Sequence, residues 1–171
     1  MMSRELGFFG RYILLLIIQL LLCNYFMLSP YVMLTLLPAM VLSIPLRYAT
    51  PQVLLIAFVT ALAVDFLVDG VPGLNVVALL PVALARKTFI RWVFGAGLFA
   101  RGEDFSIHKN GLEKVSLVML LSLSLFLFVY IWVDGSGMRP RWFFFVRFFA
   151  SLSASYVLSL LAIVYFSIND R

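Results

Sequence analysis

The chain has 171 residues, of which 64% are hydrophobic and only 12% are charged, and its mean hydropathy is +1.07. Soluble domains carry about 25% charged residues. A chain of this length also has too little interior to hide so much apolar surface from water. The composition therefore excludes an ordinary soluble domain and predicts one all-α membrane domain with lipid as its main solvent.

The net charge of +5 does not indicate nucleic-acid binding, because the basic residues lie at the ends of the apolar segments. Lysines and arginines at such positions are typical determinants of membrane topology. We therefore expect the lipid bilayer, and no nucleic acid, to be the partner of these charges.

Six apolar segments follow one another along the chain, separated by turn residues or charges. The expected membrane spans are residues 12–28, 31–46, 52–68, 74–94, 115–133 and 142–168, with a polar cytoplasmic connection at about 95–114. The first segment has no small-residue cleavage site and is expected to be a retained span. Cys23 within it is the only cysteine, so it forms no internal disulfide.

The second segment, and the part of the fourth that precedes Arg86-Lys87, are shorter than the ~20 residues of a membrane helix, and they contain Pro38, Pro45 and Pro81. We expect kinked helices covered by their neighbours, or a locally thinned bilayer. Residues 88–100 either extend the fourth segment or lie along the interface.

Ten of the thirteen basic residues fall on one side of a six-span arrangement. The positive-inside rule then predicts that both termini are cytoplasmic and that the connection between spans 3 and 4 is external. An even number of spans requires the termini to lie on the same side, and the charges satisfy this independently.

An acidic turn rich in Gly and Pro joins the third and fourth segments. Carboxylates are costly near hydrocarbon, so they indicate a partner or a turn. Glycine reaches positive φ easily and proline cannot continue a ladder of N–H bonds, so the chain is expected to reverse here. The candidate structural or partner-binding residues of this turn are Asp65, Asp69, Gly70, Pro72, Gly73 and Asn75.

Arg147, in the sixth segment, is expected at a membrane depth similar to that of Asp65, which suggests an ion pair between spans 3 and 6. Small residues at intervals of four support close packing of these spans. They are Ala57 and Ala61 in span 3, and Ser151, Ser155 and Ser159 in span 6. Two alternatives stay open: Arg147 reaches lipid head groups, and Asp65 caps the turn or contacts water.

No catalytic, cofactor-binding or metal-binding pattern is present in the sequence. His108 is the only histidine and lies in a charged connection, where the carboxylates have irregular spacing. There is no glycine-rich phosphate loop and no Ser/His/Asp set. We therefore expect no enzymatic activity and no cofactor.

The segment from Asp65 through Pro72-Gly73-Leu74-Asn75 to Arg86-Lys87 resembles the central hairpin of the bacterial rod-shape-determining MreD family. That family has an Asp at the end of an apolar helix, a short turn, a Gly-Leu-His or Gly-Met-Asn motif and a further apolar helix ending in basic residues. Residues 11–46 are similar to the version found in Bacteroidetes-type bacteria. Two departures are the second acid, Asp69, and Asn75 in a position where many members have His.

The resemblance implies a non-enzymatic, multi-pass scaffold of the cell-elongation machinery in the bacterial inner membrane, which helps to organise peptidoglycan synthesis and cell shape. Its implied partners are an MreC-like bitopic protein, the RodA–transpeptidase synthase and an MreB-like cytoskeleton, contacted directly or indirectly. The family is also similar in fold to the substrate-binding subunits of energy-coupling-factor vitamin transporters. Such a subunit is the alternative interpretation, although it needs a cavity lined by several hydrogen-bonding groups.

Overall fold

The computed structural model describes residues 2–25, 32–69, 72–95, 111–135 and 141–168. Within these ranges it contains six α-helices and one π-helical turn, so the predicted all-α fold class is confirmed. The elements are α1 (Met2–Tyr25), α2 (Leu37–Ser43), α3 (Thr50–Val64), η1 (Asp65–Asp69), α4 (Leu74–Phe94), α7 (Leu112–Gly135) and α8 (Arg141–Ile168).

Among the residues that the structure describes, three stretches of helix are long and apolar enough to cross a membrane: Thr50–Val68, Leu112–Gly135 and Trp142–Ile163. A shorter apolar helix covers Gly10–Tyr25. These helices indicate a membrane protein. The six-span arrangement and the side on which the termini lie stay predictions.

Two helices form the centre of the bundle. α4 packs against α7 along its length, while α3 packs on α4 and α8 packs on α7. The inward face of α7 repeats every four residues, as one face of a helix does. Its buried residues are Val115, Val118, Met119, Ser122, Leu123, Phe126, Leu127, Tyr130 and Ile131. Because nearly every residue of this helix is apolar, this face cannot be distinguished in the sequence.

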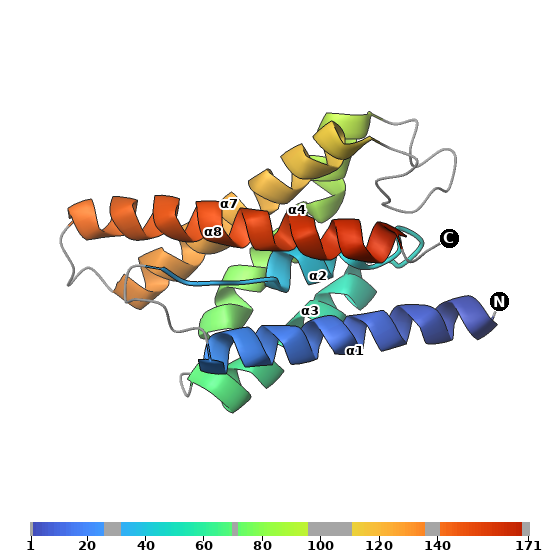
Figure 1. The fold of residues 1–171 in the computed structure, drawn as a ribbon, viewed down its shortest axis with the longest axis horizontal. Coiled ribbons are helices and arrows are strands. Elements are labelled where there is room, and N and C mark those ends of the chain that lie inside the picture. Colours follow the sequence, from blue (N-terminus) through green and yellow to red (C-terminus); the bar gives the residue numbers. More distant parts are fainter. Residues whose placement is uncertain (1, 26–31, 70–71, 96–110, 136–140, 169–171) are drawn as a thin grey trace.

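In Figure 1, α1 (blue) and α8 (red) run in opposite directions on either side of α2 and of the extended segment that precedes it. The beginning of α1 and the end of α8 lie at the same end of the molecule. Hydrogen bonds join the extended segment to both of these helices, so the neighbourhood seen in the picture is a real contact.

The second predicted span is not a helix over residues 31–46, and that expectation was wrong. Residues 33–36 are non-helical, and only the seven residues of α2 are helical before the chain turns at 44–49. Pro38 lies in the first turn of α2, where a missing N–H is tolerated, and Pro45 lies beyond its end. The prolines therefore delimit a short helix instead of kinking a long one.

The fourth predicted span is one continuous helix. α4 runs to Phe94, although Pro81 lies inside it. Of the two possibilities left open by the sequence, residues 88–94 extend this helix, and residues 96–100 lie outside the described part. The end of α1 at Tyr25 is three residues before the expected end of span 1, and residues 26–28 are also outside.

Candidate functional site

Asp65, at the start of η1, is completely buried and caps the beginning of α4. Its Oδ2 accepts a hydrogen bond of 2.8 Å from the backbone N–H of Gly73. Its Oδ1 accepts two more from Asn75, 3.0 Å from the backbone N–H and 2.9 Å from Nδ2 of the side chain. A carboxylate at a helix N-terminus is favoured because the first N–H groups have no partner within the helix.

The local backbone explains how a residue eight positions earlier can cap α4. η1 widens the end of α3, and such single π-turns often mark functional sites. Gly73 then adopts a φ of 100°, which places it in the left-handed region that glycine enters readily. The chain reverses within a few residues and returns the N–H groups of Gly73 and Asn75 to the carboxylate.

The structure brings together only part of the predicted acidic turn. Asp65, Gly73 and Asn75 form one hydrogen-bonded unit. Pro72 is exposed. Asp69 is the last residue of η1, and its side chain lies outside the described part of the chain. Gly70 lies entirely outside it.

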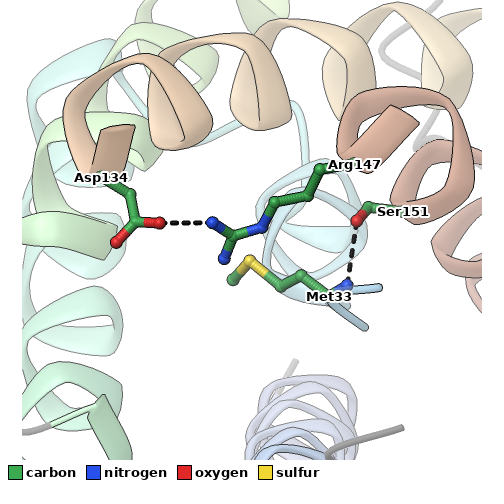
Figure 2. A network of polar contacts seen from close by, with 4 residues as sticks. All are labelled: Met33, Asp134, Arg147 and Ser151. Carbon is green, nitrogen blue, oxygen red and sulfur yellow. Dashed lines mark hydrogen bonds and ion pairs between the residues drawn. The ribbon is translucent and has the colours of Figure 1, made fainter. Parts of the chain in front are cut away.

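The predicted ion pair between Asp65 and Arg147 is wrong. Nη1 of Arg147 instead donates to Oδ2 of Asp134, near the end of α7 (Figure 2). The pair is partly shielded, since the Arg147 side chain is 13% exposed and that of Asp134 is 28% exposed. The oxygens of Asp65 already accept hydrogen bonds from nearby N–H groups. Because α8 packs on α7, Asp134 of α7 is the acid that pairs with Arg147.

The serines of α8 were predicted to pack against span 3, but two of them bind the extended segment before α2 instead. Ser151 Oγ accepts a hydrogen bond of 2.9 Å from the backbone N–H of Met33. Ser155 Oγ accepts one of 3.1 Å from Thr35 N–H and donates one of 3.1 Å to Met33 C=O. The serine stripe therefore does not pack against α3. It supplies hydrogen bonds to an extended backbone that has no helix ladder of its own.

Two further side chains, which the sequence analysis did not select, hold the ends of α2. Gln19 Oε1 in α1 accepts a hydrogen bond of 2.6 Å from Leu36 N–H, at the beginning of α2. Arg86 in α4 is almost completely buried and donates from Nη2 to the carbonyls of Leu42 and Ile44, at the end of α2. A cation at a helix C-terminus is electrostatically favourable.

A sequence signal for both residues existed. Gln19 is a polar residue in the middle of a long apolar run, and such residues inside a membrane usually have a specific partner. Arg86 follows only a dozen residues of span 4. The sequence analysis counted it among the basic residues of the cytoplasmic side, and that pattern did not indicate that its side chain is buried at the end of α2.

Within the described residues, no group of three or more His, Cys, Asp or Glu side chains could hold a metal ion. His108 lies outside them. No protein-family model, curated protein or solved structure matches the chain. The described part of the chain is therefore all-helical and has helices of membrane-spanning length. Most of its buried polar side chains that form hydrogen bonds bind backbone groups of the same chain.

Proposed function

We propose that this chain is a non-enzymatic membrane scaffold of the bacterial cell-elongation machinery, related to the MreD family. The observation that carries the proposal is the hairpin of Asp65, Gly73 and Asn75. These residues carry the sequence resemblance, and they also form one buried hydrogen-bonded unit. A Gly-Leu-Asn motif after an Asp-ended helix then has a physical reason: the acid, the glycine and the amide are parts of one cap.

The use of the buried polar side chains supports a scaffold over an enzyme. Gln19, Asp65, Ser151 and Ser155 bind backbone groups. Such contacts make a non-helical segment tolerable inside a membrane, where unpaired backbone groups are costly. They produce a defined shape that can present surfaces to partner proteins, which is what a scaffold requires.

In this proposal the chain crosses the bacterial inner membrane six times, with both termini in the cytoplasm. The second crossing consists of residues 32–43. The four residues 32–35, if extended, cover ~13 Å, and Leu36, which has helical dihedrals, together with the seven residues of α2 adds ~12 Å. The sum approaches the ~30 Å of the hydrocarbon core. A short span can therefore cross without thinning the bilayer, because extended backbone is longer per residue than helix.

The proposed partners are an MreC-like bitopic protein, the RodA–transpeptidase synthase and, directly or through these, an MreB-like cytoskeleton. The test is a mild-detergent pull-down of the full chain from its host, with mass spectrometry. We expect elongation proteins in the wild-type sample and a strong reduction with Asp65→Ala, which removes the cap. Glu113→Ala, at an exposed acid in α7, is the matched control and should retain the partners.

Depletion of the protein in the host provides an independent readout. We expect rounded cells and mislocalised wall synthesis. Recovery of an ATPase module in the pull-down, together with normal cell shape and a specific vitamin requirement, would instead support the energy-coupling-factor subunit. A reporter fused after residue 168 should report the cytoplasmic side, and one inserted at residues 70–71 the opposite side.

A further inference from the structure

The last two turns of α4 carry positive charge and a tryptophan on one outward face. Thr88, Arg91 and Trp92 are exposed there, and Lys87 is partly exposed. We propose that these four residues form a surface site for the head group of an anionic phospholipid at this end of the bundle. This inference goes beyond the proposed scaffold function and does not depend on it.

Helical spacing brings the two cations of this face together. Lys87 and Arg91 are four residues apart in a continuous helix, so their side chains leave the same face ~6 Å from each other. Thr88 and Trp92 repeat this spacing one residue further on. A phosphate can therefore contact an ammonium, a guanidinium and a hydroxyl within about one turn of helix, and the planar guanidinium can bind two of its oxygens.

The same face of α4 is apolar before these residues. Val77 and Leu84 are exposed on it, and Leu84 lies ~6 Å before Thr88 along the helix axis. An acyl chain can lie against Leu84 while its head group lies beside Thr88 and Arg91. An acidic protein segment would match the charges but would leave this apolar stretch uncovered, so the face fits a lipid better.

Trp92 marks the level of the membrane surface at this end. Its side chain is 74% exposed, and exposed tryptophans gather at the membrane–water interface. The centre of its ring system lies 6.2 Å from that of Phe89, which packs against the apolar core. The indole is therefore supported by Phe89 and open to the surroundings elsewhere. Its N–H is a further donor for an oxygen of the head group.

The charges of α4 favour an anion even though the site lies near the end of the helix. A helix C-terminus carries the equivalent of about −0.5 charge, which opposes anion binding. Residues Leu74–Phe94 contain three basic residues and no acid. One of them, Arg86, is buried and bonded to the end of α2, so Lys87 and Arg91 are the two cations at the surface. Two positive charges exceed the opposing half charge, and this face of α4 is net positive.

The experiment compares two lipids on the purified full chain in a maltoside detergent. Phosphatidylglycerol and phosphatidylcholine of the same chain length are titrated separately, and bound lipid is counted by native mass spectrometry. We expect phosphatidylglycerol to bind on the order of tenfold more tightly, because the choline ammonium cancels the charge of its phosphate. Equal binding of the two lipids would overturn the site.

Substitutions test whether the preference belongs to α4. Arg91→Gln should lower the affinity for phosphatidylglycerol about fivefold, and Lys87→Gln with Arg91→Gln should make the two lipids bind about equally. The affinity for phosphatidylcholine is the internal control for folding, because general damage to the structure would lower both affinities. A double variant that keeps the wild-type preference would contradict the proposal.

Lys114→Gln is the matched control, because it removes one positive charge from the same end of the bundle but from another helix. Figure 1 shows the beginning of α7 beside the end of α4, and Nζ of Lys114 lies 6.0 Å from the centre of the Phe94 ring. This variant should bind phosphatidylglycerol as the wild type does. A loss as large as that of Arg91→Gln would mean that lipids respond to the total charge of this end, and the site on α4 would fall.

Two soluble competitors identify the source of the negative charge. Inorganic phosphate should displace phosphatidylglycerol only weakly, because it makes no contact with Leu84 or the indole of Trp92. A short peptide of glutamates should also compete weakly, for the same reason. Competition by phosphate at concentrations like those of the lipid would assign the site to a free anion. Such competition by the peptide would assign it to an acidic protein segment, and either result would overturn the lipid site.

Discussion

Asp65 and Arg147 are both charged residues within apolar helices, and the structure treats them differently. Asp65 is fully buried and satisfied by three hydrogen bonds from uncharged N–H groups of Gly73 and Asn75. Arg147 is partly exposed and pairs with another charge, Asp134, on a neighbouring helix. Asp65, the more deeply buried of the two, is bound by N–H groups, whereas Arg147 is bound by an opposite charge.

Helix ends explain this difference. The first N–H groups of α4 need an acceptor, so a carboxylate placed there satisfies the helix and itself at once. Its partners lie within ten residues, which keeps the loop that must be closed short. An ion pair gives up the hydration of two charges, and its attraction offsets only part of that loss. Partial exposure reduces that loss for Arg147 and Asp134.

The largest expected effect belongs to Asp65. Asp65→Ala leaves the partly buried N–H of Gly73 and the buried N–H groups of Asn75 without this acceptor, and we expect the free energy of unfolding to fall by on the order of 3–4 kcal/mol. Unfolding in mixed micelles, followed by helical circular dichroism, measures the change. Glu113→Ala, at an exposed acid, should change it by less than ~0.5 kcal/mol. Equal effects of the two substitutions would contradict the cap.

The serines of α8 give the next largest effect. Ser155→Ala removes the acceptor of Thr35 N–H and the donor to Met33 C=O, and we expect a loss of about 2 kcal/mol. Ser153→Ala is a closely matched control, because Ser153 is exposed and bonds only to carbonyls of its own helix. The same unfolding measurement compares them. A loss with Ser153→Ala as large as that with Ser155→Ala would mean that the extended segment is held by other contacts.

The sequence predicts helices well here because long apolar segments between turns have few alternatives in lipid. It also identifies the residues of the Asp65 cap, since an acid, a glycine and an amide within eleven residues are local signals. It cannot predict the pairing of Arg147, because depth alone does not choose between Asp65 and Asp134. In the sequence, residues 32–36 look like part of a helix. Their non-helical form depends on hydrogen bonds with Gln19, Ser151 and Ser155, which are distant in the chain.

A smaller effect is expected at Gly73, the backbone counterpart of Asp65. No atom lies within 4 Å of an added Cβ there, so the penalty of Gly73→Ala comes from its positive φ alone. We expect a loss of about 1–2 kcal/mol of stability. Gly10→Ala in α1 also has open space and has no such φ, so it should be neutral or stabilising by up to ~1 kcal/mol. Thermal unfolding in detergent distinguishes the two signs, and a neutral Gly73→Ala would contradict the strained turn.

The smallest expected effects are two coupling energies, and they test the comparison of Asp65 with Arg147 most directly. A double-mutant cycle with Asp134→Ala and Arg147→Ala should give a favourable coupling of about 1 kcal/mol, between the values of exposed and buried pairs. The corresponding cycle with Asp65→Ala and Arg147→Ala should be additive within ~0.5 kcal/mol, because these residues share no partner. The free energy of unfolding, measured in mixed micelles, is compared among the variants of both cycles. Coupling of Asp65 to Arg147 comparable to that of Asp134 would show that the two charges act on each other after all. The local cap would then not be sufficient to explain why a fully buried carboxylate is tolerated.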